Sequence, residues 1–266
     1  MRIRTRAPRG PVIDTRPVWG TVIRIELRDH VDHDAIDAVW AWFERVDELF
    51  STWRADSEVS RLARGELDIG AVTPDVREVL DRCEQLRRLS DGGFDVAFAA
   101  GSRVAAPGRC AIDPTGLVKG WAVDRAARVL TAAGAANFSI NAGGDVLVAG
   151  GPATGQPWRV GIQHPWQRDR VAAAIGVTDA AVATSGAYER GHHVFDGRTG
   201  RVARGLASVT VVAGDLATAD GLATAALALG ADGMPWLAAQ PDVDAMGITD
   251  ARRVVKTARF DRLLVP

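Results

Sequence analysis

The sequence predicts an α+β fold in which mixed or antiparallel sheets pack against helices, within a single globular domain that has room for two lobes. Three observations favour this class. Apolar runs of strand length and helical repeats do not alternate one for one, as they would in a doubly wound sheet. No repeat, low-complexity segment or linker divides the chain. The 266 residues are 47% hydrophobic and 24% charged, which is typical of a globular protein with a substantial core.

The beginning of the chain predicts an arm, a strand and a helix. Residues 1–16 are rich in Arg and Pro and indicate a flexible N-terminal arm, followed by one domain over residues 17–266. Residues 18–27 alternate apolar and polar side chains and predict a strand. Residues 34–49 repeat apolar side chains at helical spacing and predict an amphipathic helix with one face in the core.

Two further helices are indicated by their end signals. Thr73-Pro74 is typical of a helix start, and Gly92-Gly93 ends that helix. A turn at residues 112–116 leads into a helix over residues 118–133, for which Gly134 is the expected C-terminal stop.

The second half of the chain predicts mostly strands. Apolar runs at residues 138–140 and 146–148 flank a turn with two glycines and predict a hairpin. We expect a variable loop at residues 163–170 and an alanine-rich helix over residues 218–229, closed by Gly230. Further strands are expected at residues 158–162, 171–177, 180–184, 208–212, 245–249 and 253–258.

Charge, hydropathy and cysteine content exclude several classes of protein. The 32 basic and 33 acidic residues leave no excess charge, and no basic stripe indicates a nucleic-acid partner. No apolar run approaches the ~18 residues of a membrane span. The N-terminus lacks the apolar core of a signal peptide, so we expect a cytoplasmic protein. Cys83 and Cys110 have no metal-ligand spacing, and we expect structural thiols in a reducing compartment.

A polar stretch at residues 184–200 indicates an active-site loop. It holds the only tyrosine and four of the 28 glycines, and it lies between two apolar runs. His192 and His193 both fall within it, and either could act as a general base because imidazole titrates near neutral pH. A histidine between buried strands can equally be structural. Composition alone does not choose between these roles or between these two residues.

Asp220 and Thr224 form a candidate metal site. They are four residues apart near the start of a predicted helix, so their side chains share one face. A carboxylate and a hydroxyl there could bind Mg²⁺ together with substrate phosphates, which a helix N-terminus also favours. The alternative is that Asp220 only complements the helix dipole.

Four other residues could contact a ligand, and each has a simpler alternative. Asp113 and Lys119 flank a predicted helix start, where a carboxylate could bind a ribose or ring donor and an ammonium a phosphate. They could equally be a helix-start signal and a surface charge. Trp19 and Trp53 lie beside turns, where an indole could stack on a flat heterocycle or simply pack.

Taken in order, these groups resemble the FAD:protein FMN transferase family, also called the ApbE family. The resemblance covers residues 18–230 and rests on seven ordered blocks. The blocks are Trp19-Gly20-Thr21; Phe50 through Arg54 with Asp56-Ser57; Gly93-Phe94-Asp95; Asp113 through Asp124; Asn141 through Asp145; Thr184 through Gly200; and Ser208 through Thr224.

The resemblance implies an ApbE-like fold and Mg²⁺-dependent transfer of the FMN moiety of FAD to a Thr or Ser hydroxyl of an acceptor protein, with release of AMP. It implies a divalent metal bound by Asp220, Thr224 and the backbone carbonyl of Gly116. It assigns His193 to activation of the acceptor hydroxyl. The positions that it assigns to FAD contacts are Trp19, Trp53, Phe94, Asp95, Asp113, Lys119 and Val194.

The chain departs from the family pattern at four points. Trp19 stands where the family usually has methionine, and Gly197 stands in place of a proline. Only 17 residues separate Asp95 from Asp113, so a segment of the family is shortened. The lipoprotein signal of many members is absent, which favours the cytoplasm. Two alternatives to transfer are a metal-dependent FAD pyrophosphatase, giving FMN and AMP, and a flavin-binding protein without turnover.

Overall fold

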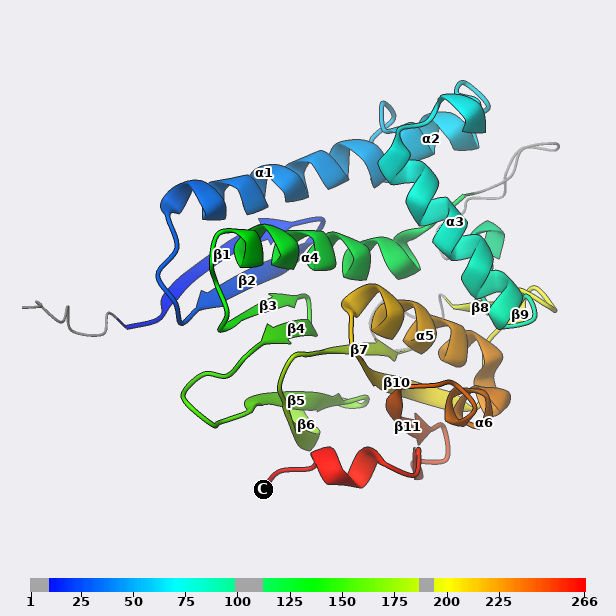
Figure 1. The fold of residues 1–266 in the computed structure, drawn as a ribbon. Helices are drawn as coiled ribbons and strands as arrows, with labels where there is room; N and C mark the ends of the chain where they lie inside the picture. Colours follow the sequence, from blue (N-terminus) through cyan, green and yellow to red (C-terminus); the bar gives the residue numbers. More distant parts are fainter. Residues whose placement is uncertain (1–9, 99–111, 187–193) are drawn as a thin grey trace, which may run out of the picture.

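The computed structural model describes residues 10–98, 112–186 and 194–266, which are arranged in layers around one sheet (Figure 1). The sheet has eight strands in the order β1-β2-β3-β4-β7-β10-β11-β12, and every neighbouring pair is antiparallel. The predicted α+β class is confirmed. The strands are β1 (Val12–Val18), β2 (Thr21–Leu27), β3 (Phe138–Ala142), β4 (Asp145–Ala149), β7 (Ala180–Gly186), β10 (Leu206–Ala213), β11 (Asp244–Thr249) and β12 (Val254–Lys256).

Helices cover one face of this sheet. α4 (Thr115–Ala132) and α5 (Leu216–Leu229) pack on the strands, and α1 (His33–Phe50) packs on α4. The predicted stripe of α1 is buried as expected from its spacing. The remaining helical elements are α2 (Glu58–Ala63), α3 (Pro74–Leu89), α6 (Gly233–Ala238), η1 (Ile69–Ala71), η2 (Val96–Phe98) and η3 (Gly230–Asp232).

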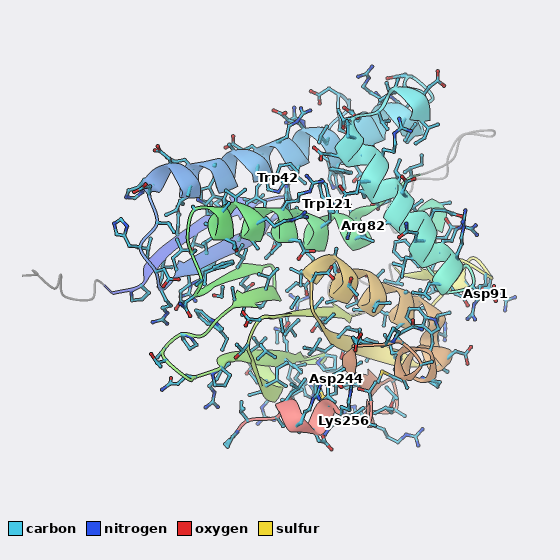
Figure 2. The ribbon with its side chains drawn as sticks, in the orientation of Figure 1. Trp42, Arg82, Asp91, Trp121, Asp244 and Lys256 are labelled. Carbon is cyan, nitrogen blue, oxygen red and sulfur yellow. The ribbon has the colours of Figure 1, made fainter. Side chains whose placement is uncertain are left out.

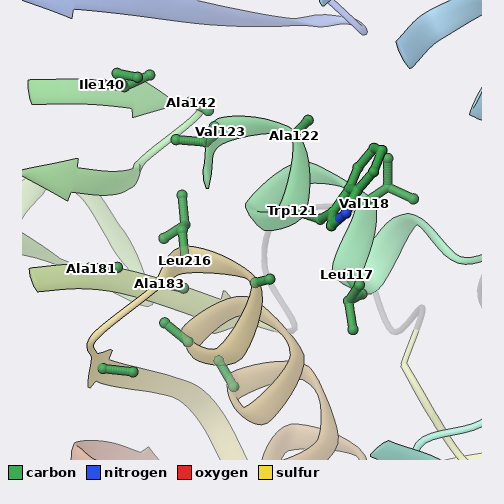
Figure 3. Close-up of a cluster of buried hydrophobic side chains, with 14 of the residues drawn as sticks. Leu117, Val118, Trp121, Ala122, Val123, Ile140, Ala142, Ala181, Ala183 and Leu216 are labelled. Atoms are coloured by element: carbon green, nitrogen blue, oxygen red, sulfur yellow. The ribbon is translucent and has the colours of Figure 1, made fainter. Parts of the chain in front are cut away.

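A glycine allows α4 and α5 to cross closely within the helical layer (Figure 3). A Cβ atom on Gly120 would lie 2.3 Å from the carbonyl oxygen of Leu216 and 2.8 Å from the backbone nitrogen of Ala217. Because both neighbours are backbone atoms, only glycine permits this approach. Trp121 and Leu117 flank Gly120 on α4 and are buried in the same core. The crossing fixes the first turns of the two helices relative to each other.

A hairpin and the C-terminal turn lie against the other face of the sheet. β5 (Trp158–His164) pairs with β6 (Gln167–Val177), and η4 (Phe260–Leu263) packs beside them. A second, smaller core fills this side and includes the buried side chains of Trp158, Ile162, Ile175 and Phe260. A short ribbon of β8 (Phe195–Asp196) and β9 (Arg201–Val202) completes the described strands.

Three sequence-based boundaries differ from the structure. Residues 12–16, expected in the flexible arm, belong to β1, which pairs with β2 along its whole length. The helix expected from residue 118 begins at Thr115, whose N–H donates a hydrogen bond to the Asp113 carboxylate. The loop expected at residues 163–170 is wrong, since β5 and β6 continue through it to a tight turn at Pro165-Trp166.

The structure describes one of the two cysteines and bears on the question of a membrane span. Cys83 is buried on α3, and burial raises the pKa of its thiol to about 12, which suits a structural residue. Cys110 lies outside the described residues. Within the described ranges, none of the helices has the length and apolar character needed to cross a membrane.

Candidate active site

The crossing of α4 and α5 brings together three predicted site residues from separate segments. A Cβ atom on Gly116 would lie 3.1 Å from Thr224 Cγ2, 3.5 Å from Thr224 Oγ1 and 3.3 Å from Phe94 Cε2. The Gly116 peptide therefore faces both the Thr224 side chain on α5 and the Phe94 ring. Phe94 is itself buried, and its N–H donates to Ser90 Oγ at 2.9 Å.

Asp220 lies one turn before Thr224 on α5 and reaches the same part of α4. Its side chain is buried, and Oδ2 accepts a hydrogen bond from the Gly120 N–H at 3.1 Å. In an α-helix the N–H of residue 120 points toward the carbonyl of residue 116. The Asp220 carboxylate therefore lies about one helical turn along α4 from Gly116, so a carboxylate and a hydroxyl of α5 both face the first turns of α4.

This donor set fits a hard cation. Carboxylate, hydroxyl and carbonyl oxygens are the ligands that Mg²⁺ prefers, and Mg²⁺ commonly binds only one or two carboxylates. In the part of the chain that the structure describes, no group of three or more His, Cys, Asp or Glu side chains forms a metal-binding cluster. A site of this kind would instead use Asp220 as its one charged protein ligand.

Ser185 adds a hydroxyl that the sequence analysis did not assign to the site. It lies near the end of β7, and its Oγ is 3.1 Å from Thr224 Oγ1. The hydrogen bond joins the sheet to the α5 face that bears Asp220 and Thr224. The signal in the sequence was the Thr-Ser-Gly triplet at the start of the polar loop, but its partner 39 residues away depends on the fold.

Lys119 is oriented by a buried carboxylate, which the sequence analysis also left without a role. Lys119 Nζ lies 2.5 Å from Asp145 Oδ2, and Asp145 Oδ1 accepts from the Thr184 N–H at 2.9 Å. The Asp145 side chain is 3% exposed, whereas that of Lys119 is 27% exposed. Asp145 thus ties α4 to β4 and β7 and holds a partly exposed ammonium beside the α4–α5 crossing.

Asp113 and Asp95 belong to the segment next to Phe94. The Asp113 N–H donates to the Val96 carbonyl at 3.0 Å, and its carboxylate accepts from the Thr115 N–H at 3.0 Å. Asp95 Oδ1 accepts from the Ala97 N–H at 2.9 Å. Both carboxylates are therefore fixed by local backbone hydrogen bonds close to the start of α4.

The last part of the polar stretch, residues 194–200, packs on the Phe94–Asp95 turn. The Gly197 N–H donates to the Gly93 carbonyl at 3.0 Å, and a Cβ atom on Gly197 would lie 2.8 Å from Asp95 Cβ. A proline here, as in the family pattern, would remove this N–H donor. Val194 begins this part, and its carbonyl accepts from the Ala203 N–H at 3.0 Å. His192 and His193 lie outside the described residues.

Arg198 stabilises the same segment through Asp196. The guanidinium donates to both carboxylate oxygens, with Nε to Oδ1 and Nη2 to Oδ2 each 2.9 Å. These hydrogen bonds lower the pKa of Asp196 below its usual range. The residues that follow the predicted histidine are therefore held by a bidentate ion pair.

The two tryptophans assigned to FAD contacts come from earlier elements of the chain and lie apart from this group. Trp19 occupies the β1–β2 turn at φ 53°, and its Nε1–H donates to the Phe43 carbonyl at 3.2 Å. Trp53 follows α1 and is 92% exposed. Among the described residues, no hydrogen bond or ring contact joins either indole to the α4–α5 crossing.

The N-terminus of α5 is capped from α4. Asp124 Oδ1 and Oδ2 accept from the Leu216 and Ala217 N–H groups at 2.8 and 2.9 Å. Asp215 caps the same helix through the Thr218 N–H. Burial raises the pKa of Asp124 to about 6, although the two backbone hydrogen bonds act in the opposite direction.

A groove between α3 and α5 lies next to the crossing but is separate from the predicted site. Its volume is about 980 Å³, and Leu86, Leu117 and Gly221 are among its lining residues. None of the predicted site residues lines it. The candidate site is therefore defined by converging polar groups.

Together the fold and the site define an α+β protein in which polar side chains from α4, α5 and β7 lie close together where the two helices cross. The sequence profile of the ApbE family matches residues 19–108 and 99–247, and the chain belongs to this family.

Similar proteins agree with this assignment. Over 94% of its length the chain is 30% identical to an FAD:protein FMN transferase of Rhodobacter capsulatus, and the match spans 58% of that relative. It is 29% identical to an FAD:protein FMN transferase of Vibrio cholerae over 70% of this chain and 71% of the relative. The chain thus spans only part of the length of these curated relatives.

Solved structures show the same fold. The flavin transferase ApbE of Vibrio cholerae superposes with a TM-score of 0.82 at 25% identity, covering 96% of this chain and 99% of that one. An ApbE protein from Thermotoga maritima gives a TM-score of 0.82 at 23% identity, covering 96% of this chain and 100% of that one.

Proposed function

We propose that this protein is a Mg²⁺-dependent enzyme that transfers the FMN moiety of FAD to a Thr or Ser hydroxyl of an acceptor protein and releases AMP. The relatives whose names state FAD:protein FMN transferase support the reaction class. The observation that carries the proposal is the meeting of Asp220, Thr224 and the Gly116 peptide at one helix crossing. FAD and the acceptor protein are then the two substrates.

Asp220, Thr224 and the Gly116 carbonyl would bind the metal. One negative charge and two neutral oxygens leave positions for water and phosphate oxygens, as is usual for Mg²⁺. When bound, the metal would neutralise charge on the FAD pyrophosphate. Ser185 hydrogen-bonds Thr224 and so restricts the rotamers of that side chain.

Lys119 and the turn near Phe94 would bind FAD. Asp145 directs the Lys119 ammonium to one place, where it can pair with a phosphate oxygen. Phe94 offers an aromatic ring beside Gly116, Asp95 offers a carboxylate on the same turn, and Asp113 offers one on the neighbouring segment before α4. The remaining FAD contacts in the proposal are Val194, Trp19 and Trp53.

His193 is proposed as the general base. The acceptor hydroxyl oxygen forms a bond to the FMN phosphorus, and its proton passes to His193. The bond between that phosphorus and the bridging oxygen breaks, and AMP leaves with the oxygen. If water replaces the hydroxyl, the same residues would hydrolyse FAD to FMN and AMP.

The test is an incubation of the purified protein with FAD, Mg²⁺ and a flavin-acceptor domain. We expect AMP in solution and a fluorescent flavin band on the denatured acceptor, both lost when EDTA is added. AMP with an unlabelled acceptor would indicate the pyrophosphatase instead. Bound FAD with no AMP would indicate a flavin-binding protein, and either outcome would overturn the transferase.

The choice of histidine is tested by two matched variants. His193→Ala should slow transfer by roughly a hundredfold while FAD affinity stays unchanged, because a general base contributes on this scale. His192→Ala is the control and should retain most of the activity. A larger loss in the control would show that the base is His192.

A further inference from the structure

A narrow cavity lies between β6 and β12, on the sheet face opposite the helices. Its volume is about 670 Å³. It belongs to none of the elements that build the candidate active site. The residues that line it are Ala172, Ala173, Ala174, Met246, Val254, Lys256, Leu264 and Val265.

One wall of this cavity is the edge of β6. Ala172, Ala173 and Ala174 are consecutive, and successive side chains of a strand point to opposite faces. The register of β6 with β5 shifts at Ala172, and Val265, which also lines the cavity, bonds Ala174 on the edge of β6 that faces away from β5, so the cavity lies along that edge. β6 pairs with β5 on its other side.

The free edge of β6 is occupied only at its end. The Val265 N–H donates to the Ala174 carbonyl at 3.0 Å, and an isolated bridge joins Ile175 to Leu264. Among the described residues, no strand pairs with this edge before Ala174. The backbone groups of residues 169–173 on that side are therefore accessible to an added strand.

The floor of the cavity is one face of β12 and β11. Val254 and Lys256 line it but Val255 does not, as expected from the alternation along a strand. Val254 is 54% exposed and Leu264 is 38% exposed. A segment paired with β6 would cover these two apolar side chains with every second residue.

Basic residues outnumber acidic ones in the hairpin and in the C-terminal segment, the two parts of the chain next to the cavity. The hairpin residues 158–171 and the C-terminal residues 250–266 together contain eight Lys or Arg and three Asp, although the whole chain has a net charge of −1. All eight basic residues are exposed. Figure 2 shows Lys256 and Asp244 beside the C-terminal turn, far from Trp42 and Trp121 on the helical side.

Part of this positive charge is balanced internally. Asp244 lies 2.8 Å from Arg262 and 3.5 Å from Arg259, and Lys256 pairs with Asp261. The remaining basic residues come from segments that are far apart in the sequence, so they form no continuous basic run. An acidic partner would meet favourable charge from both sides of the cavity.

The geometry points to a docking surface for an extended acidic segment of a partner protein, which adds as a third strand to the free edge of β6. Alternate side chains of this segment are apolar and pack on Val254 and Leu264. The others are acidic and face the surrounding arginines. Addition of a strand to an exposed edge is a common mode of peptide recognition. The inference does not depend on the proposed function.

The probe is a short fluorescein-labelled peptide that alternates valine with glutamate, titrated with the full chain and followed by anisotropy. We expect saturable binding, and slower hydrogen exchange of the amides of residues 169–173 in the complex. The same peptide with lysine in place of glutamate should bind at least about tenfold more weakly. Equal binding of the two peptides, or no change in exchange in β6, would overturn the proposal.

Two neighbouring variants give a matched control. Val254→Glu places a carboxylate on the floor of the cavity and should weaken peptide binding at least about tenfold. Val255→Glu adds the same charge on the opposite face of β12 and should leave the affinity unchanged. Both side chains are exposed, so neither change removes core packing. Equal effects of the two variants would contradict docking in this cavity.

A lipid surface is the competing occupant of a basic and apolar patch. Sedimentation with phosphatidylserine vesicles distinguishes it from a peptide. We expect vesicle binding, where it occurs, to be equal in wild type and Val254→Glu. If the variant loses vesicle binding and the acidic peptide fails to bind wild type, the surface belongs to a membrane and the proposal is wrong.

Discussion

The two faces of the central sheet are covered in different ways. On the helical face, α4 and α5 approach so closely that backbone meets backbone at Gly120, and polar groups converge beside this contact. On the other face, the β5–β6 hairpin and the C-terminal turn form a smaller core and leave Val254 and Leu264 partly exposed. The candidate active site thus lies on the closely packed face of the sheet, and the open edge of β6 lies on the other face.

This difference indicates where the molecule tolerates change. The side chains that contact a substrate must be held by rigid elements, and the α4–α5 crossing provides such elements. An edge that receives a partner segment needs accessible backbone groups instead. Substitutions of the same kind should therefore have different effects on the two faces. Some pairs should differ in the free energy of unfolding, and others in enzymatic activity.

Gly120→Ala should give the largest effect. The new Cβ atom would lie 2.3 Å from the Leu216 carbonyl oxygen, and backbone on both sides cannot yield without separating the helices. We expect a loss of about 3 kcal/mol or more in the free energy of unfolding, measured by urea titration.

The matched control for this variant is Gly161→Ala on β5. Its Cβ atom would meet Val171 Cγ2 at 3.4 Å, which is an ordinary contact. We expect a change within about 1 kcal/mol. A similar loss in both variants would show that the two faces are packed equally tightly.

Asp220→Asn should remove metal-dependent activity. The amide keeps an oxygen that can accept from the Gly120 N–H, but it loses the only charge among the proposed ligands. We expect AMP formation to fall about a hundredfold or more and its Mg²⁺ dependence to disappear. Asp215→Asn, at the half-buried N-cap of the same helix, should retain activity. Unchanged Mg²⁺ dependence in Asp220→Asn would refute the assignment.

Asp145→Asn should weaken FAD binding rather than chemistry. The substitution removes the counter-charge that orients Lys119, so the KM for FAD should rise about tenfold with a smaller change in kcat. Asp244→Asn is the control on the opposite face, where a buried carboxylate faces Arg259 and Arg262. It should lower stability and leave the KM unchanged, and an equal rise in KM would mean that Asp145 is only structural.

The sequence predicted the site residues that share one element better than those that meet across elements. Asp220 and Thr224 share a face because helical spacing requires it, and they do so in α5. The bonds from Lys119 to Asp145 and from Ser185 to Thr224 join different layers, so their detection requires the strand order. The resemblance to the family pointed to segments that the fold brings together, but it did not indicate these two contacts.

The errors in the predicted fold have a common physical cause. Residues 12–16 and 163–170 form strands whose outer residues are exposed, so apolar and polar side chains do not alternate along them. Backbone pairing with β2 and β5 determines these strands. The second of them provides the free edge on which the docking surface depends.

Asp124 should give the smallest effect, and it tests how firmly the helical face is held. Its pKa of about 6 in the folded protein lies above the value of 3.8 for an unperturbed aspartate, so its protonated form favours folding. Its contribution to stability is therefore present at low pH and is lost as the pH rises from about 4 to about 6.

The free energy of unfolding of wild type minus that of Asp124→Asn should fall by about 1 kcal/mol per pH unit in this range. The variant changes the capping bonds to Leu216 and Ala217 by an amount independent of pH, so only the slope is diagnostic. A difference that rises with pH would mean that these hydrogen bonds to the ionised carboxylate outweigh burial, and that the α5 N-terminus gains stability from the charge.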